Sequence, residues 1–132
     1  MRLNILTVDD SKGLRLVVQK ALRPFDCIAS EAKDGFDAFF AIERARPDLI
    51  LLDVNMPIMD GIEALERLKA APELAAIPVI MLASPADHVV MPKLVPMGAS
   101  AVLMKPFNEA ALLEKIRGVL DLPPAIDVRI LG

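Results

Sequence analysis

The chain has 132 residues, a length that suits a single domain with one buried core. Its formal net charge of -3 argues against nucleic acid as a direct partner, and its single cysteine, Cys27, excludes an internal disulfide. No apolar run reaches the roughly 18 residues of a membrane span, and the acidic N-terminal segment does not resemble a signal peptide, so we expect a cytoplasmic protein without a membrane partner.

Short apolar runs alternate with longer segments of helical periodicity along the chain. The runs are too continuously apolar for a sheet with one face in water, which favours parallel strands buried on both faces. This (βα)5 alternation predicts an α/β fold with a doubly wound, five-stranded parallel sheet and helices on both faces. The predicted strands are 4–8, 27–30, 48–53, 77–82 and 101–104, and the predicted buried helix faces are Leu14/Val17/Val18/Ala21/Leu22, Phe36/Phe39/Phe40, Ile62/Leu65/Leu68 and Leu112/Leu113/Ile116/Val119/Leu120.

Local signals mark three helix ends. Asp60, with Glu63 three residues later, is an aspartate variant of the capping box and predicts a helix start. Asn108 can cap the last helix in a similar way, and Gly98 stands where a helix should end.

The segment 85–97 departs from the regular pattern. Pro92 and Pro96 interrupt the fourth helix that the alternation requires, so we expect an irregular or broken helix there. Apolar side chains outnumber polar ones in this segment, so we expect some of them to stay exposed. Such a surface would bind a downstream protein or a second copy of the chain.

The sequence indicates a domain boundary after residue 121. We assign residues 1–121 to the domain and residues 122–132 to a C-terminal tail or linker, which begins with the break at Pro123 and Pro124. Alternation of apolar and polar residues over 126–131 predicts a short extra strand, with a disordered tail as the open alternative.

Polar residues follow the predicted strands where these strands end. The first strand is followed by Asp9 and Asp10, the third ends in Asp53, the fourth leads to Ser84, and the fifth leads to Lys105. Ligands of open parallel sheets bind at this edge. At an effective dielectric constant near 20, two carboxylates 4 Å apart repel each other by about 4 kcal/mol. Three acids in one cluster would therefore destabilise the fold or have raised pKa values unless a cation joins them. Oxygen ligands without Cys or His favour Mg2+ over Mn2+ or Ca2+.

Asp53 is a candidate nucleophile. A carboxylate at a strand tip beside a divalent metal and a lysine can attack a phosphoryl group, because both cations neutralise the charge on the phosphoryl oxygens. A single acid at a strand end is more often a cap or a turn former. The combination of three acids, a hydroxyl and a lysine after neighbouring strands favours the catalytic interpretation.

These residues lie in motifs that resemble the receiver domains of two-component response regulators. The motifs are VDDS (8–11), LLDVNMPIMDG (51–61), LAS (82–84) and GASAVLMKPF (98–107), and the resemblance covers about residues 3–120. It implies the flavodoxin-like fold with strand order 2-1-3-4-5.

The resemblance also implies the chemistry of the site. Asp53 would accept a phosphoryl group from a histidine kinase or a histidine phosphotransfer protein. Asp10, Asp53 and the backbone carbonyl of Asn55 would bind Mg2+, and Asp9 would act largely through water. The domain would catalyse only its own phosphoryl transfer and self-dephosphorylation.

The implied switch is where this sequence departs from the family. Lys105 would pair with the phosphoryl group, and Ser84 would move to bond it when the domain switches on. The family usually has an aromatic residue where Val102 stands, and a residue with a free backbone N–H where Pro85 stands. These departures affect the expected route of signal transmission. The polar residues that the phosphorylation chemistry needs are all present.

Two alternatives stay open. A degenerate receiver that acts as a phosphorylation-independent interaction module is compatible with Val102 and Pro85. A phosphatase or phosphotransferase with an aspartyl nucleophile usually has a second acid two residues after the nucleophile. Asn55 occupies that position and cannot serve as a general acid.

Overall fold

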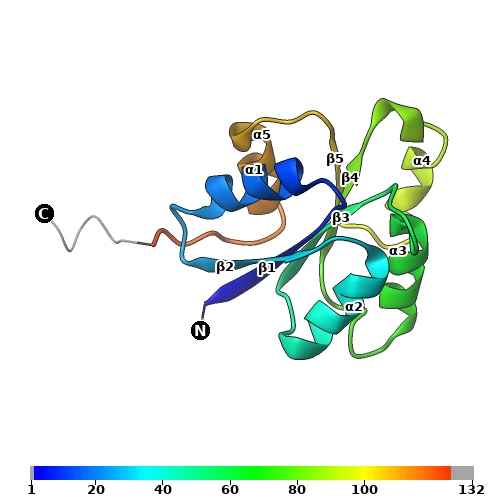
Figure 1. Cartoon of the computed structure of the whole chain (residues 1–132), viewed down its shortest axis with the longest axis horizontal. Helices are drawn as coiled ribbons and strands as arrows, with labels where there is room; N and C mark the ends of the chain where they lie inside the picture. The colour runs from blue at the N-terminus through cyan, green and yellow to red at the C-terminus, as the bar shows by residue number, and fades with distance from the viewer. Residues whose placement is uncertain (1, 126–132) are drawn as a thin grey trace, which may run out of the picture.

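The structure is a computed structural model that describes residues 2–125, and Figure 1 shows a sheet with helices on both sides. The strands are all parallel and lie in the order β2-β1-β3-β4-β5, which confirms the predicted fold and topology. The elements in chain order are β1 (Leu3–Val8), α1 (Lys12–Leu22), β2 (Cys27–Ala32), α2 (Gly35–Arg44), β3 (Leu49–Asp53), α3 (Gly61–Ala70), β4 (Val79–Ala83), the 3-10 turn η1 (Pro85–Asp87), α4 (Met91–Leu94), β5 (Ala101–Met104) and α5 (Glu109–Arg117).

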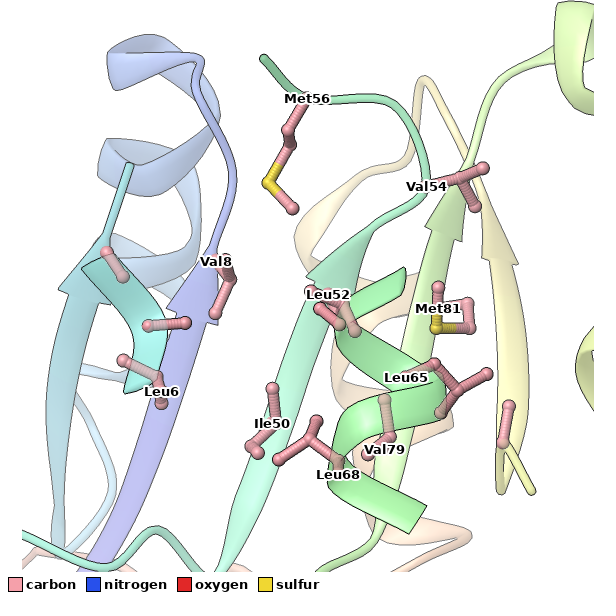
Figure 2. Packing of buried hydrophobic residues seen from close by; sticks show 14 of the residues in the cluster. Leu6, Val8, Ile50, Leu52, Val54, Met56, Leu65, Leu68, Val79 and Met81 are labelled. Carbon is pink, nitrogen blue, oxygen red and sulfur yellow. The ribbon is translucent and has the colours of Figure 1, made fainter. Parts of the chain in front are cut away.

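Alternate residues of the central strands pack on opposite faces of the sheet. In β3, Ile50 and Leu52 belong to the core covered by α2, α3 and α4, whereas Leu49 and Leu51 belong to the core covered by α1 and α5. Figure 2 shows the first of these cores, where α3 places Leu65 over β3 and β4. Because both faces are covered, β4 and the part of β3 that precedes Asp53 are apolar and buried, as the sequence predicts.

Helix α2 turns a different face to the core than the one we predicted. Its phenylalanines follow helical spacing, yet Phe36 and Phe40 are 56% and 53% exposed, and only Phe39 is half-buried. The buried residues of α2 are Gly35, Ala38, Ala41 and Ile42, so all but one of them are small. A helix with alanine at its buried positions packs close to the sheet, and the larger rings then point outward, where Phe36 and Phe40 pack edge to face.

The segment 85–97 is irregular, as predicted. It begins with the turn η1 and then forms only the four-residue helix α4, with Pro92 in its first turn. Leu94 is fully buried and anchors the segment to the core. Val89 and Val95 are 70% and 55% exposed, which confirms that some of its apolar side chains stay in contact with solvent.

The predicted helix ends are also confirmed. The Asp60 side chain accepts a hydrogen bond from the Glu63 N–H at 2.9 Å, and the Asn108 side chain accepts one from the Ala111 N–H at 2.8 Å. Gly98 adopts a φ of +115°, a conformation that side chains disfavour, where the chain leaves the α4 region for β5.

Residues 122–125 remain in contact with the domain. Leu122 is buried beside α1 and α5, and the Ala125 N–H donates to the Pro24 carbonyl oxygen at 2.9 Å. The predicted strand at 126–131 lies outside the described residues. Within residues 2–125, no helix has the length and apolar character needed to cross a bilayer.

Candidate functional site

The carboxyl edge of the sheet gathers the polar residues that the sequence predicts. Asp53 is the last residue of β3, and Asp9 and Asp10 directly follow β1. Ser84 follows β4 and Lys105 follows β5. These strands are neighbours and run parallel, so the residues that follow them lie at one end of the sheet.

Lys105 bridges two buried acids. Its Nζ lies 2.7 Å from Asp9 Oδ2 and 3.0 Å from Asp53 Oδ1. Asp9 is fully buried and Asp53 is 3% exposed. Carboxylates removed from water are costly unless they are paired, so the ammonium group offsets both their desolvation and their mutual repulsion.

Burial and hydrogen bonding shift the pKa values of Asp53 and Lys105. It raises the pKa of Asp53 to about 6, and the negative charge of Asp9 acts in the same direction, while the hydrogen bond from Lys105 opposes both. Burial alone would lower the pKa of Lys105, but its hydrogen bonds to Asp9 and Asp53 outweigh that effect and raise it. At pH 7.5 the site therefore holds an ionised Asp53 beside a charged lysine.

A third acid completes a possible cation site. Asp9, Asp10 and Asp53 each place one carboxylate oxygen within 4.8 Å of the others. Asp10 is exposed, which leaves the cluster open to solvent on one side. Three carboxylates without nitrogen or sulfur ligands suit a hard divalent cation, so the residues present fit Mg2+.

The two other predicted site residues occupy the loops around this cluster. The Asn55 backbone N–H donates to Asp53 Oδ1 at 3.4 Å, and the Asn55 side chain is exposed. Ser84 is half-buried, and its backbone N–H donates to Asp87 Oδ2 at 2.8 Å. Asp87 therefore holds the turn that carries Ser84, a role that was not predicted from the sequence.

Two contacts to Asp9 were also missed. The Ser11 N–H donates to Asp9 Oδ1 at 2.8 Å, and the Arg15 guanidinium donates to the Asp9 backbone carbonyl oxygen at 2.7 Å. The available signal was weak: Arg15 is a basic residue one turn into α1, where the first turn contains no acid.

The loop after Asp53 depends on a close backbone approach. A Cβ placed on Gly61 would lie 2.0 Å from the Asp53 carbonyl oxygen, and the Gly61 N–H donates to the Val54 carbonyl oxygen at 2.9 Å. Any side chain at this position would push the backbone of Asp53 away. Glycine at residue 61 is thus required by the position of Asp53.

We predict that Gly61→Ala lowers the free energy of unfolding by about 2–3 kcal/mol, because the added methyl group meets backbone that cannot move aside cheaply. Gly13→Ala is the matched control, since a Cβ there meets only Ser11 Oγ at 3.8 Å. That change in α1 should raise stability by roughly 0.5 kcal/mol. Urea denaturation measures both effects, and a shift of the same sign in both variants would contradict the steric explanation.

Comparison with known proteins identifies the family. The sequence model of the response regulator receiver domain matches residues 5–117. The chain belongs to the response regulator receiver domains. Every residue of the site described above lies within the matched range of this receiver domain.

Individual relatives agree with the assignment. The chemotaxis protein CheY of Halobacterium salinarum is 35% identical over 120 residues, which cover 91% of this receiver domain chain and 98% of that protein. The structure of CheY4 of Vibrio cholerae superposes with a TM-score of 0.83 at 32% identity, over 91% of this chain and 100% of that one. The phosphorylated cyanobacterial phytochrome response regulator RcpA has a TM-score of 0.79 at 27% identity, over 93% and 99% of the two chains. The protein is therefore a CheY-like receiver domain of two-component signalling.

Proposed function

We propose that Asp53 is the phosphoacceptor of this receiver domain and that a histidine kinase or a histidine phosphotransfer protein is the donor. The observation that carries the proposal is the bridge from Lys105 to Asp53 and Asp9, with Asp10 completing the acid cluster. A buried acid at a strand tip, paired with a lysine and adjacent to two more acids, has the environment of a nucleophile for phosphoryl transfer.

The residues of the chain divide the chemistry between them. The ionised Asp53 carboxylate attacks the phosphorus atom, the P–N bond of the donor phosphohistidine breaks, and an aspartyl phosphate forms. The Lys105 ammonium group is within reach of the Asp53 oxygen and neutralises charge on the phosphoryl oxygens. Transfer to Asp53 and later hydrolysis of its acyl phosphate are the only reactions we assign to the domain.

Asp10, Asp53 and the backbone carbonyl of Asn55 would hold Mg2+, with Asp9 acting largely through water. When bound, the ion would supply positive charge beside the phosphoryl oxygens. Asp9 is fully buried and already bonded to Lys105 and to the Ser11 N–H, which agrees with an indirect role. The exposed Asp10 is free to approach the ion from the solvent side.

Incubation with acetyl phosphate and Mg2+, followed by intact-mass spectrometry, tests the proposal. We expect one phosphoryl group per chain, and none when EDTA is added. A degenerate receiver would incorporate no phosphate under either condition. A phosphatase would instead hydrolyse many equivalents of p-nitrophenyl phosphate. The phosphorylated state of the relative RcpA supports the first outcome.

We assign the output surface to the segment 85–97, which would bind a downstream protein or a second copy of the chain. It begins at Ser84, whose hydroxyl would bond the phosphoryl group, and it carries the exposed side chains of Val89 and Val95. A movement of Ser84 toward Asp53 would shift η1, because the turn is tied to Ser84 through Asp87.

Pro85→Ala should increase the fraction of the domain in its active conformation. Proline has no N–H to offer the phosphoryl group, and a hydrogen bond to a charged group contributes about 1.5–3 kcal/mol, or about one to two orders of magnitude in the active:inactive ratio. Amide chemical shifts with beryllium fluoride report that ratio. Pro96→Ala is the control, since it removes a proline from the same segment far along the chain from Ser84. Equal ratios in all three proteins would show that another donor compensates.

A further inference from the structure

Arg15 forms a link between α1, the edge strand β2 and the loop that carries two of the site acids. Its Nη1 donates to the Asp9 backbone carbonyl oxygen at 2.7 Å, and its Nε donates to Glu31 Oε1 at 3.0 Å. The other oxygen of Glu31 accepts a hydrogen bond from Gln19 Nε2 at 2.6 Å. The Arg15 side chain is only 17% exposed, so the guanidinium is held and does not sample solvent freely.

The carbonyl that Arg15 binds belongs to the peptide unit between Asp9 and Asp10. On the other side of Asp9, the backbone N–H donates to the Ala32 carbonyl oxygen of β2 at 3.1 Å. Both ends of the residue are thus fastened to β2, one directly and one through Arg15 and Glu31. Rotation of this peptide unit would change the direction of the exposed Asp10 side chain, whose other flanking peptide unit is held by the hydrogen bond from the Ser11 N–H to Asp9 Oδ1.

We propose that Arg15 is a positioning residue for the divalent cation site. It fixes the peptide unit between Asp9 and Asp10, so that the Asp10 carboxylate stays close to that of Asp53. Arg15 binds neither the cation nor the phosphoryl group, and its effect passes through Asp10. This inference rests on the proposed function, because it assumes that the three acids bind Mg2+.

Charge and positioning predict opposite results when Arg15 is replaced. A guanidinium repels a nearby dication, so charge alone predicts tighter Mg2+ binding once the guanidinium is removed. Loss of positioning predicts weaker binding, because Asp10 then samples orientations that do not face the cation. Mutation of a residue that orients a metal ligand without binding the metal typically lowers the metal affinity by about 10-fold to 100-fold.

The test is calorimetric titration of the metal-free protein with Mg2+ at pH 7.5. We expect Arg15→Met to raise the Kd by about 10-fold. Arg2→Met is the matched control, because Arg2 also binds one carboxylate, that of Asp26, and one backbone carbonyl, that of Cys27, at the opposite end of β1. The Arg2 variant should keep the Kd of the unsubstituted protein.

Arg15→Lys distinguishes the effect of the positive charge from that of the hydrogen-bonding geometry. It also replaces Arg15→Met in the test if the methionine variant does not fold. It keeps the positive charge, but a single ammonium group cannot reproduce the fork that joins Glu31 to the Asp9 carbonyl, so we expect the Kd to rise by about 3-fold. In an Asp10→Asn background, Arg15→Met should change the Kd by less than about 2-fold, since the ligand through which it acts is already weakened.

An unchanged or tighter Kd in Arg15→Met or Arg15→Lys overturns the inference and leaves the proposed function standing. An equal loss in the Asp10→Asn background also overturns it, because Arg15 would then act through some other group. If the unsubstituted protein binds no Mg2+, the proposed function fails, and the inference fails with it.

Discussion

Asp53→Asn should abolish phosphate incorporation from acetyl phosphate and leave the fold intact. Asparagine has nearly the shape of aspartate and can still accept the hydrogen bond from Lys105, but its amide is not a nucleophile. Intact-mass spectrometry measures the incorporation. Asp26→Asn, which changes an acid at the opposite end of the sheet, should be labelled normally. Persistent labelling of Asp53→Asn would place the phosphoacceptor at another residue.

The same substitution should stabilise the metal-free protein at neutral pH. Burial raises the pKa of Asp53 to about 6, above its value in the unfolded chain, so the folded state holds the proton more tightly. That stabilisation is complete below about pH 4 and is lost as the pH rises to about 6. Asparagine does not ionise, so its advantage should be about 0.5 kcal/mol at pH 4 and about 3 kcal/mol at pH 7.5.

Urea denaturation in EDTA at the two pH values measures this difference. Added Mg2+ should raise the stability of the unsubstituted protein more than that of the variant, because the variant lacks one anionic ligand. An advantage of equal size at both pH values would show that packing, and not ionisation of Asp53, causes the effect.

The fold could be predicted because its signals are local and repeated. The segments 48–53 and 77–82 are apolar enough to be buried on both faces, and the alternation of such segments with helical periodicity leaves few possible topologies. The face of α2 was harder to predict. Hydrophobicity favours burying Phe36 and Phe40, but α2 instead buries the side that carries Ala38, Ala41 and Ile42. The small residues on that side let the helix pack close to the sheet, and hydrophobicity alone does not indicate this.

Some residues of the site could also be predicted from the sequence, and others could not. Asp53 and Lys105 could be predicted because the carboxyl ends of parallel strands meet at one edge, so position along the strand is enough. Arg15 could not, because its partner Glu31 is 16 residues away on a different element and its other partner is a backbone oxygen. Every residue has a backbone carbonyl, so the sequence does not indicate which carbonyl a side chain will bind.

Lys105→Met should lower the free energy of unfolding of the metal-free protein by about 3 kcal/mol at pH 7.5. The lysine is the cation that Asp9 and Asp53 share, and both acids are almost inaccessible to water. Removing one partner of a buried ion pair costs about 3–5 kcal/mol, because the other charge is left uncompensated. Lys20→Met removes an exposed lysine from α1 and should change the stability by less than about 0.5 kcal/mol.

The pH dependence identifies the cause of this loss. Without Lys105, Asp53 loses the hydrogen bond and the positive charge that lower its pKa, and protonation of Asp53 relieves the repulsion between it and Asp9. The loss of stability should therefore be smaller at pH 5 than at pH 7.5, and Mg2+ should recover part of it by supplying the missing positive charge. Urea denaturation at both pH values, with and without Mg2+, measures these effects. A loss that is the same in all four conditions would mean that Lys105 stabilises the fold through its aliphatic chain, and that its charge does not hold the acid cluster together.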